Sequence, residues 1–187
     1  MTTSPAFSPV DLQSRSLPIR LAAIAFGTLL LAISSRIEVP MVPVPVTMQT
    51  FTVALIGALY GWRLGTITVL AWLGQAAAGL PVLAGGAGGL AHFAGPTGGY
   101  LAAFPVMAAL IGWLAERGWN GNRAGLAFLS MLAGNLLCLA LGAAWLSRGI
   151  GWDAAITHGV LPFLLGAVLK SAVGALALRQ VGRPRRA

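Results

Sequence analysis

The sequence contains little charge, and acidic residues are the scarcest. Only 9% of its 187 residues are charged, with 4 Asp+Glu against 12 Lys+Arg, whereas soluble globular domains have roughly 25%. This shortage excludes a soluble globular domain. A single cysteine, Cys138, excludes an intrachain disulfide and a cysteine-based zinc cluster. The net charge of +8 is better explained by arginines that flank membrane spans than by binding to nucleic acid. We therefore predict no nucleic-acid partner.

The sequence also lacks the residue patterns that catalysis requires. It has no H-E-x-x-H, G-x-S-x-G or P-loop motif, and no pair of carboxylates within an apolar stretch. An enzyme would depend on two histidines and one lysine. We therefore predict no enzymatic activity, no cofactor and no metal site. A small intramembrane enzyme and a purely structural subunit are the alternatives from other functional classes.

Apolar runs are abundant instead. Hydrophobic residues make up 57% of the chain, and several runs approach the roughly 20 residues that cross a bilayer. We predict an all-α, polytopic protein embedded in the lipid bilayer, with a polar cytoplasmic tail (1–18), a single six-helix membrane domain (19–178) and a basic cytoplasmic tail (179–187). The second and third helices are short and only Gly61-Trp62-Arg63 separates them. The predicted transmembrane helices are 19–35, 47–60, 64–79, 98–115, 124–146 and 154–178.

The distribution of arginine indicates the orientation of the chain. If both termini are cytoplasmic, nine arginines lie inside and only Arg36 and Arg148 lie outside. Positively charged loops resist translocation, so this asymmetry predicts that both termini are cytoplasmic. The nine inside positions are Arg15, Arg20, Arg63, Arg117, Arg123, Arg179, Arg183, Arg185 and Arg186.

Two of the predicted outside connections are unusual. Residues 38–46 contain three prolines, which remove backbone donors and favour an extended course. Residues 80–99 contain two glycine-rich stretches, and irregular backbone near a membrane is tolerated only where protein or a water-filled cavity satisfies it. Two irregular connections on one face of the membrane predict a lidded pocket.

Lys170 is the only cation that lies within an apolar segment and away from its ends. An ammonium group there costs about 2.5 to 3.5 kcal/mol on insertion scales unless it reaches an anion, a cavity or the interface. A lysine that snorkels to the interface is the alternative, but Lys170 lies far from both ends of its segment. No predicted span contains an acidic residue to pair with it. We therefore predict that Lys170 contacts an anionic ligand group such as a carboxylate.

Other polar and small residues have two interpretations each. His92 is either a ligand contact or a solvated loop residue, and Asn135 is either an interhelical hydrogen-bonding residue or a ligand contact. Small residues on the first predicted helix have the spacing that lets helices approach closely. They serve either packing within the chain or docking of a partner subunit, and they are Ala22, Ala23, Ala25 and Gly27.

The order of several motifs resembles the BioY family, the biotin-binding membrane subunits of energy-coupling factor (ECF) transporters. The resemblance covers about residues 20–178. The matching stretches are Pro43-Val44-Pro45-Val46-Thr47-Met48-Gln49-Thr50-Phe51, Gly57-Ala58-Leu59-Tyr60-Gly61, Gly79-Leu80-Pro81-Val82-Leu83-Ala84-Gly85-Gly86, Gly95-Pro96-Thr97-Gly98-Gly99-Tyr100-Leu101, and Gly159-Val160-Leu161-Pro162-Phe163 leading to Lys170.

The resemblance implies a substrate-specific (S) component that captures biotin from the outer face and mediates its uptake across a bacterial cytoplasmic (inner) membrane. It also implies partners, namely a transmembrane coupling protein and two ATPase subunits, although some family members occur without them. The small residues of the first helix would then form the docking surface. The substrate contacts that we expect are Lys170, Gly95, Thr97, Gly98, Tyr100, Phe163, His92 and Asn135.

One departure from the family pattern concerns the last helix. The family reads P-F-x-P-G-D-x-x-K, whereas this chain has Ala167 in place of the acid. Residues at i and i+3 share one face of a helix, so the acid and the lysine would act together on a ligand. Without the acid we expect an unpaired Lys170 and either weaker biotin binding or tolerance of a related vitamin. Restoring the acid by Ala167→Asp should then raise the affinity for biotin.

Overall fold

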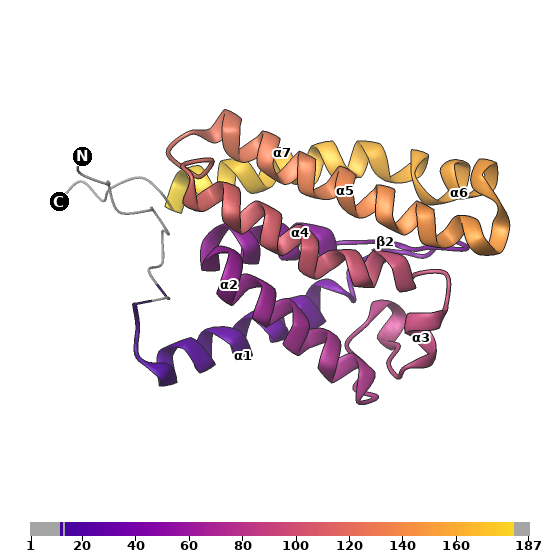
Figure 1. Cartoon of the computed structure of the whole chain (residues 1–187), viewed down its shortest axis with the longest axis horizontal. Helices are drawn as coiled ribbons and strands as arrows, with labels where there is room; N and C mark the ends of the chain where they lie inside the picture. Colours follow the sequence, from indigo (N-terminus) through magenta and orange to yellow (C-terminus); the bar gives the residue numbers. More distant parts are fainter. Residues whose placement is uncertain (1–11, 13, 182–187) are drawn as a thin grey trace.

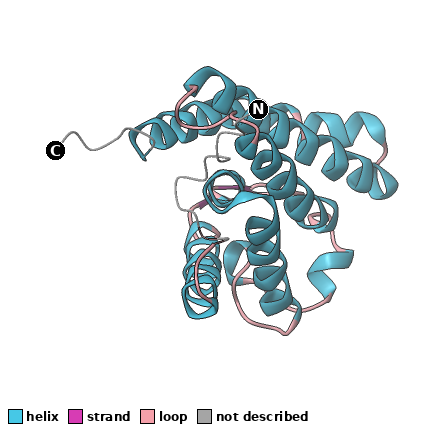
Figure 2. Cartoon of the chain, turned by 60° about the vertical axis from the view of Figure 1, so that its left-hand side comes forward, coloured by secondary structure: helices cyan, strands magenta, loops and turns pink. Residues whose placement is uncertain are grey.

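The computed structural model describes residue 12 and residues 14–181. Most of this part of the chain is helical (Figure 2), which confirms the predicted all-α class. The predicted tails lie mostly outside the described residues, so their location in the cytoplasm stays a prediction. The helices are α1 Leu17–Ser34, α2 Gln49–Ala77, α3 Ala91–Ala94, α4 Gly98–Glu116, α5 Ala124–Ile150, α6 Trp152–Gly159 and α7 Leu161–Val181, with a 3-10 turn at Ala84–Gly86.

The long helix α2 consists of two helices joined at Gly61. This residue has φ 78° and ψ 172°, a conformation outside helical space that glycine adopts without the steric cost of a Cβ. Figure 1 shows the two halves meeting at an angle. α4 passes directly beside this joint, because a Cβ on Gly112 would lie 2.4 Å from the backbone nitrogen of Trp62. The second and third predicted helices are therefore distinct. By length and composition the described residues hold five helices able to cross a membrane, because the two halves of α2 count as one, so the six-helix membrane domain stays a prediction.

The last predicted helix is interrupted, which corrects the continuous helix expected for 154–178. α6 ends at Gly159, and Val160 (φ −122°, ψ −60°) separates it from α7. Pro162 lies in the first turn of α7, where its missing N–H costs nothing. Within an unbroken helix the same proline would clash with the carbonyl group of His158, which explains the break.

Helix α4 lies in the middle of the bundle. It packs against α2 on one side and α5 on the other, while α1 packs on α2 and α7 packs on α5 (Figure 1). The core side chains Trp72, Met107, Ile111 and Met131 are almost completely buried. Large apolar side chains of α1 and α7, such as Phe26 and Leu165, are exposed, as expected for surfaces that face lipid.

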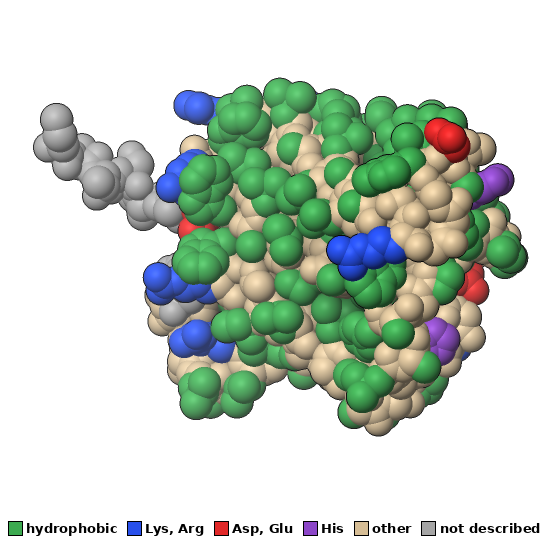
Figure 3. Space-filling view, turned by 45° about the vertical axis from the view of Figure 1, so that its right-hand side comes forward, with side chains coloured by type: hydrophobic (Ala, Val, Ile, Leu, Met, Phe, Trp, Pro, Cys, Tyr) green, Lys and Arg blue, Asp and Glu red, His purple; other side chains and the backbone are tan. Residues whose placement is uncertain are grey.

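The two ends of the bundle differ in character. At the first, which we call the arginine end, the Gly61 joint contacts the end of α4, because the backbone N–H of Trp62 donates to Glu116 Oε1 at 3.1 Å. The turn after α4 also meets the end of α7 there, since a Cβ on Gly121 would lie 2.1 Å from Leu178 O. Most of the Lys and Arg side chains visible in Figure 3 lie at its left side, with another to the right of the centre, and the histidine side chains lie at the right. This separation of charge agrees with the arginine asymmetry of the sequence.

The opposite end, which we call the hairpin end, holds both irregular connections. The proline-rich segment forms a small antiparallel hairpin from β1 (Glu38–Val39) and β2 (Val46–Thr47), with Glu38 opposite Thr47. The extended course predicted for this segment is thus observed, and these two strands are an exception to the all-α class. The second connection, residues 78–97, contains the 3-10 turn and α3.

Candidate ligand-binding cavity

A cavity of about 210 Å³ lies between the helices at the hairpin end. A buried water needs only about 10–15 Å³ of comparable space, so the cavity has the size of a ligand. The hairpin, the second connection, the first turn of α2 and helices α4, α5 and α7 all contribute to its wall. The wall residues are Val44, Pro45, Val46, Thr47, Gln49, Thr50, Leu83, Ala84, Ala87, His92, Thr97, Tyr100, Leu101, Phe104, Asn135, Cys138, Leu139, Phe163, Ala167 and Lys170.

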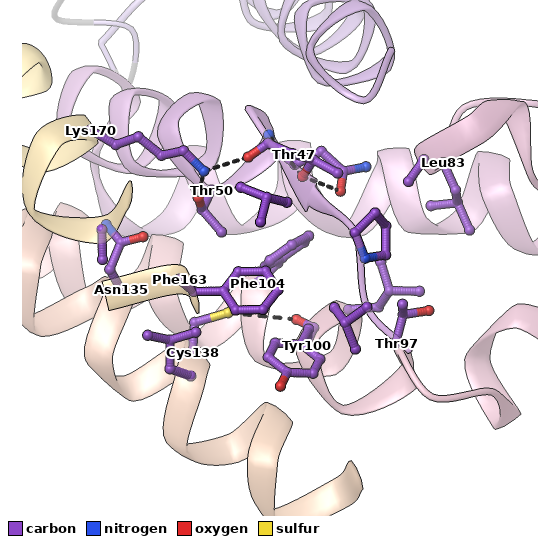
Figure 4. A pocket seen from close by; sticks show the side chains of 18 of the residues that line it. Thr47, Thr50, Leu83, Thr97, Tyr100, Phe104, Asn135, Cys138, Phe163 and Lys170 are labelled. Atoms are coloured by element: carbon purple, nitrogen blue, oxygen red, sulfur yellow. Dashed lines mark hydrogen bonds between the residues drawn. The ribbon is translucent and has the colours of Figure 1, made fainter. Parts of the chain in front are cut away.

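Most of the wall is apolar, and aromatic rings form part of it. The rings of Tyr100 and Phe163 are stacked, with centroids 6.3 Å apart and an interplanar angle of 27°. Tyr100 is oriented by its hydroxyl group, which donates to Gly159 O at 2.8 Å. Figure 4 shows the side chains of Phe104 and Phe163 at the centre of the cavity wall. Such a surface suits an apolar ring or an aliphatic chain.

Lys170 supplies the only cation of this wall within the described residues. Its Nζ donates to the backbone oxygen of Thr47 and, at 3.2 Å, to Thr50 Oγ1 (Figure 4). The expectation of an unpaired Lys170 is therefore wrong, because the hairpin and α2 provide neutral oxygen acceptors. The bond to Thr47 joins α7 to β2 across 123 residues of sequence, and the bond to Thr50 joins α7 to α2 across 120.

Asn135 contributes a buried amide from α5, with 3% of its surface exposed. Its Nδ2 donates to Met131 O at 2.9 Å and to Ser171 Oγ at 3.3 Å, so it makes the interhelical hydrogen bond typical of such residues. Asn135 also lines the cavity, so its contact with a ligand stays a prediction.

The two irregular connections are joined to each other. Arg36 Nη2 donates to Pro81 O at 2.7 Å, and Ser35 Oγ donates to Leu83 O at 3.2 Å. Leu83 lines the cavity, while Arg36 lies outside it. These bonds hold the hairpin base and the second connection together over the cavity, as the lidded pocket predicted from the sequence requires.

The structure brings together six of the eight predicted contact residues. Lys170, Thr97, Tyr100, Phe163, His92 and Asn135 line the cavity, whereas Gly95 and Gly98 do not. Gly95 O accepts a hydrogen bond from Trp145 Nε1 at 2.9 Å. A Cβ on Gly98 would lie 2.0 Å from Phe93 O, so this glycine allows close packing beside α3.

Four polar or sulfur-containing wall residues were absent from the predicted set, namely Thr47, Gln49, Thr50 and Cys138. The first three lie in the proline-rich motif at residues 43–51, which is one of the stretches that resemble the family. Their position in this motif is the sequence signal that could have identified them. Gln49 is 4% exposed and its Oε1 accepts from Thr47 Oγ1 at 3.0 Å. No three His, Cys, Asp or Glu side chains among the described residues come together as a metal site.

The predicted docking residues of α1 do not share one surface. Gly27 is buried, and a Cβ there would lie 2.5 Å from Thr68 Cγ2. Ala23 also faces α2, since its carbonyl oxygen accepts from Tyr60 OH at 3.1 Å. Ala22 and Ala25 are exposed. Packing within the chain therefore accounts for Ala23 and Gly27, which corrects the prediction of a four-residue docking surface.

The fold and the cavity define a multi-pass membrane protein with a small-molecule site between its helices. The sequence matches the BioY family over residues 6–187. The chain belongs to the BioY family, as the motifs of the sequence predicted. Membership places it among transporters and not among enzymes.

Curated relatives and a solved structure agree with this assignment. The chain is 36% identical to the probable biotin transporter BioY of Pyrococcus horikoshii over 82% of this chain and 90% of the relative. It is 40% identical to the biotin transporter BioY of Rhizobium etli, over 78% and 81%. It also resembles a crystal structure of the S-component for biotin from an ECF-type ABC transporter, with TM-score 0.78, 32% identity and coverage of 87% and 89%.

Proposed function

We propose that this chain captures biotin in the cavity at the hairpin end and mediates its uptake across a bacterial cytoplasmic membrane. The observation that carries the proposal is a largely apolar cavity with a single lysine, placed under two joined connections. The likeness to the solved S-component for biotin supports the same conclusion.

The chemistry of biotin suits the wall of this cavity. Biotin has an apolar bicycle and an aliphatic chain, and a ureido group and a carboxylate as polar ends. Tyr100 and Phe163 provide the apolar surface, and Lys170 provides a charged donor for an oxygen of the ligand. Hydrogen bonds to charged groups contribute about 1.5–3 kcal/mol, so loss of Lys170 should weaken binding strongly.

The transport step requires a way to open the cavity to the cytoplasm. We place both termini and the arginine end in the cytoplasm, because positive loops resist translocation. A transmembrane coupling protein and two ATPase subunits would drive transport, with Ala22 and Ala25 on the exposed face of α1 as part of the contact surface. Uptake by the chain alone is the alternative, and transport assays with and without these partners separate the two.

The decisive experiment is calorimetric titration of the detergent-purified protein with biotin. We expect submicromolar binding by the wild-type chain and a Kd about 10- to 100-fold higher for Lys170→Ala, since every 1.4 kcal/mol is about tenfold. Thermal unfolding of both proteins shows whether the variant is folded. Folded wild-type protein that does not bind biotin would contradict the proposal. Related vitamins would then be titrated, because Ala167 in place of the family's acid makes them the alternative ligands.

A further inference from the structure

A second depression lies at the hairpin end, next to the cavity but separate from it. It is an open groove of about 420 Å³ between the second connection and the end of α5. Ala94, Gly95 and Pro96 line the groove, whereas His92 and Thr97 of the same segment line the cavity. This segment therefore forms a wall between two different sites. The part of the groove that α5 provides consists of Trp145, Leu146, Arg148, Gly149 and Ile150.

Three side chains of α5 form a stripe that leads into this groove. Leu141, Trp145 and Arg148 lie at i, i+4 and i+7, the spacing of residues on one helix face. The Arg148 guanidinium lies over the ring of Trp145, 5.3 Å from its centroid. Trp145 Nε1 donates to Gly95 O at 2.9 Å, and Leu141 is 40% exposed. The stripe thus runs from a cation near the end of α5, through an indole ring, to an apolar side chain nearer the middle of the helix.

Arg148 is unusual because arginines are scarce on this side of the protein. In the orientation proposed above, only Arg36 and Arg148 lie outside. Arg36 is used within the protein, where its guanidinium donates to Pro81 O at 2.7 Å. Arg148 is exposed, and among the described residues that line the groove there is no aspartate or glutamate. The groove therefore offers a positive charge to an anionic group from outside the chain.

We propose that this groove binds an anionic phospholipid of the outer leaflet, with the phosphate on Arg148 and an acyl chain along Trp145 and Leu141. A guanidinium group matches a phosphate through two parallel hydrogen bonds. Tryptophan is enriched where lipid headgroups meet acyl chains, and Trp145 lies between the cation and the apolar side chain. The order of the three side chains is therefore the order of the parts of a phospholipid. The proposal does not depend on biotin, since no groove residue lines the cavity.

The first test removes the charge of Arg148. Native mass spectrometry of the detergent-purified protein measures binding of dioleoylphosphatidylglycerol, the anionic lipid. We expect Arg148→Gln to weaken this binding about five- to tenfold and Arg63→Gln to change it less than about twofold. Arg63→Gln is the matched control, because Arg63 lies over the ring of Trp62 in the same way, at 5.1 Å, but at the arginine end.

Three outcomes of this test would overturn the proposal. An equal loss for both arginine variants would mean that net charge alone explains lipid binding. Equal affinity for zwitterionic dioleoylphosphatidylcholine would exclude recognition of an anionic lipid. Equal affinity for water-soluble glycerophosphoglycerol, the headgroup without acyl chains, would identify a phosphate site that does not use the apolar part of the groove.

The second test fills the groove and keeps the charge of Arg148. A Cβ on Gly149 or on Gly125, both in α5, would meet nothing within 4 Å, but only Gly149 lines the groove. We expect Gly149→Leu to weaken phosphatidylglycerol binding at least about fivefold, because its side chain takes the space of the lipid, and Gly125→Leu to change it less than about twofold. Thermal unfolding shows whether each variant is folded. Wild-type lipid affinity in folded Gly149→Leu would refute the groove as the site, whether or not the chain binds biotin.

Discussion

Helices α4 and α7 both line the cavity, but they are held in the fold in different ways. More than half of the 19 residues of α4 are buried, including Phe104, Met107 and Ile111. In α7, which has 21 residues, the buried strip consists of Ala167, Ser171, Gly174, Ala175 and Leu178. Because close packing between helices is a main stabilising contribution in a membrane bundle, α4 is a core helix and α7 is a peripheral one.

The peripheral helix nevertheless carries the charge of the site. α7 provides Lys170 and Phe163, and polar contacts connect it to the rest of the cavity. These contacts are the Lys170 bonds to Thr47 and Thr50 and the Tyr100 bond to Gly159, just before α7 begins. The comparison teaches that the most polar part of the site is positioned by hydrogen bonds and not by a large apolar interface.

The largest expected effect is on the packing of α4. A Cβ on Gly112 would lie 2.4 Å from the Trp62 backbone nitrogen, whereas a Cβ on Gly166 of α7 would meet nothing within 4 Å. We expect Gly112→Ala to destabilise the protein by about 1–3 kcal/mol, as overpacking does. Gly166→Ala should leave stability unchanged or slightly increased, because alanine favours helices.

Thermal unfolding in detergent measures both glycine variants under one set of conditions. Equal melting temperatures for the two variants would contradict the distinction between a core and a peripheral helix. If only Gly166→Ala lowered the melting temperature, α7 and not α4 would be the tightly packed helix.

A smaller effect should separate ligand binding from stability. Tyr100→Phe removes the hydroxyl group that donates to Gly159 O, and Tyr60→Phe removes the one that donates to Ala23 O. Each loss should cost about 0.5–1.5 kcal/mol of stability. We expect only Tyr100→Phe to weaken biotin binding also, because Tyr100 lines the cavity and positions the start of α7. The same fall in affinity for both variants would refute this specific role.

The smallest effect is expected at Thr50. Thr50→Val keeps the shape of the side chain and removes one of the two acceptors of Lys170, while the backbone oxygen of Thr47 remains. We expect a change in biotin Kd of about two- to fivefold, less than a full hydrogen bond contributes. Thr66→Val is the control, since Thr66 Oγ1 donates to Trp62 O in α2, outside the cavity wall. If calorimetry found the same change in biotin Kd for Thr66→Val, the hydrogen bond between Lys170 and Thr50 would not explain the effect of Thr50→Val.

Much of the fold was predictable because membrane helices are specified by local composition. The apolar runs located the helices, and Gly61 indicated the joint in α2. The break at Val160 was missed, since the surrounding residues are as apolar as the helices, and only Pro162 signals it. Gly27 was assigned to an outer surface because spacing indicates that small residues share a face but not which helix that face meets.

The sequence by itself determined the class of protein, the positions of most apolar helices and the family. These conclusions depend on residue type, spacing and motif order, which need no knowledge of distant contacts. Only the tertiary structure decided that Lys170 binds Thr47 and Thr50 and that Asn135 bonds to Ser171. Such contacts join residues of different elements, 123 positions apart for Lys170 of α7 and Thr47 of β2, and tertiary packing alone brings them together.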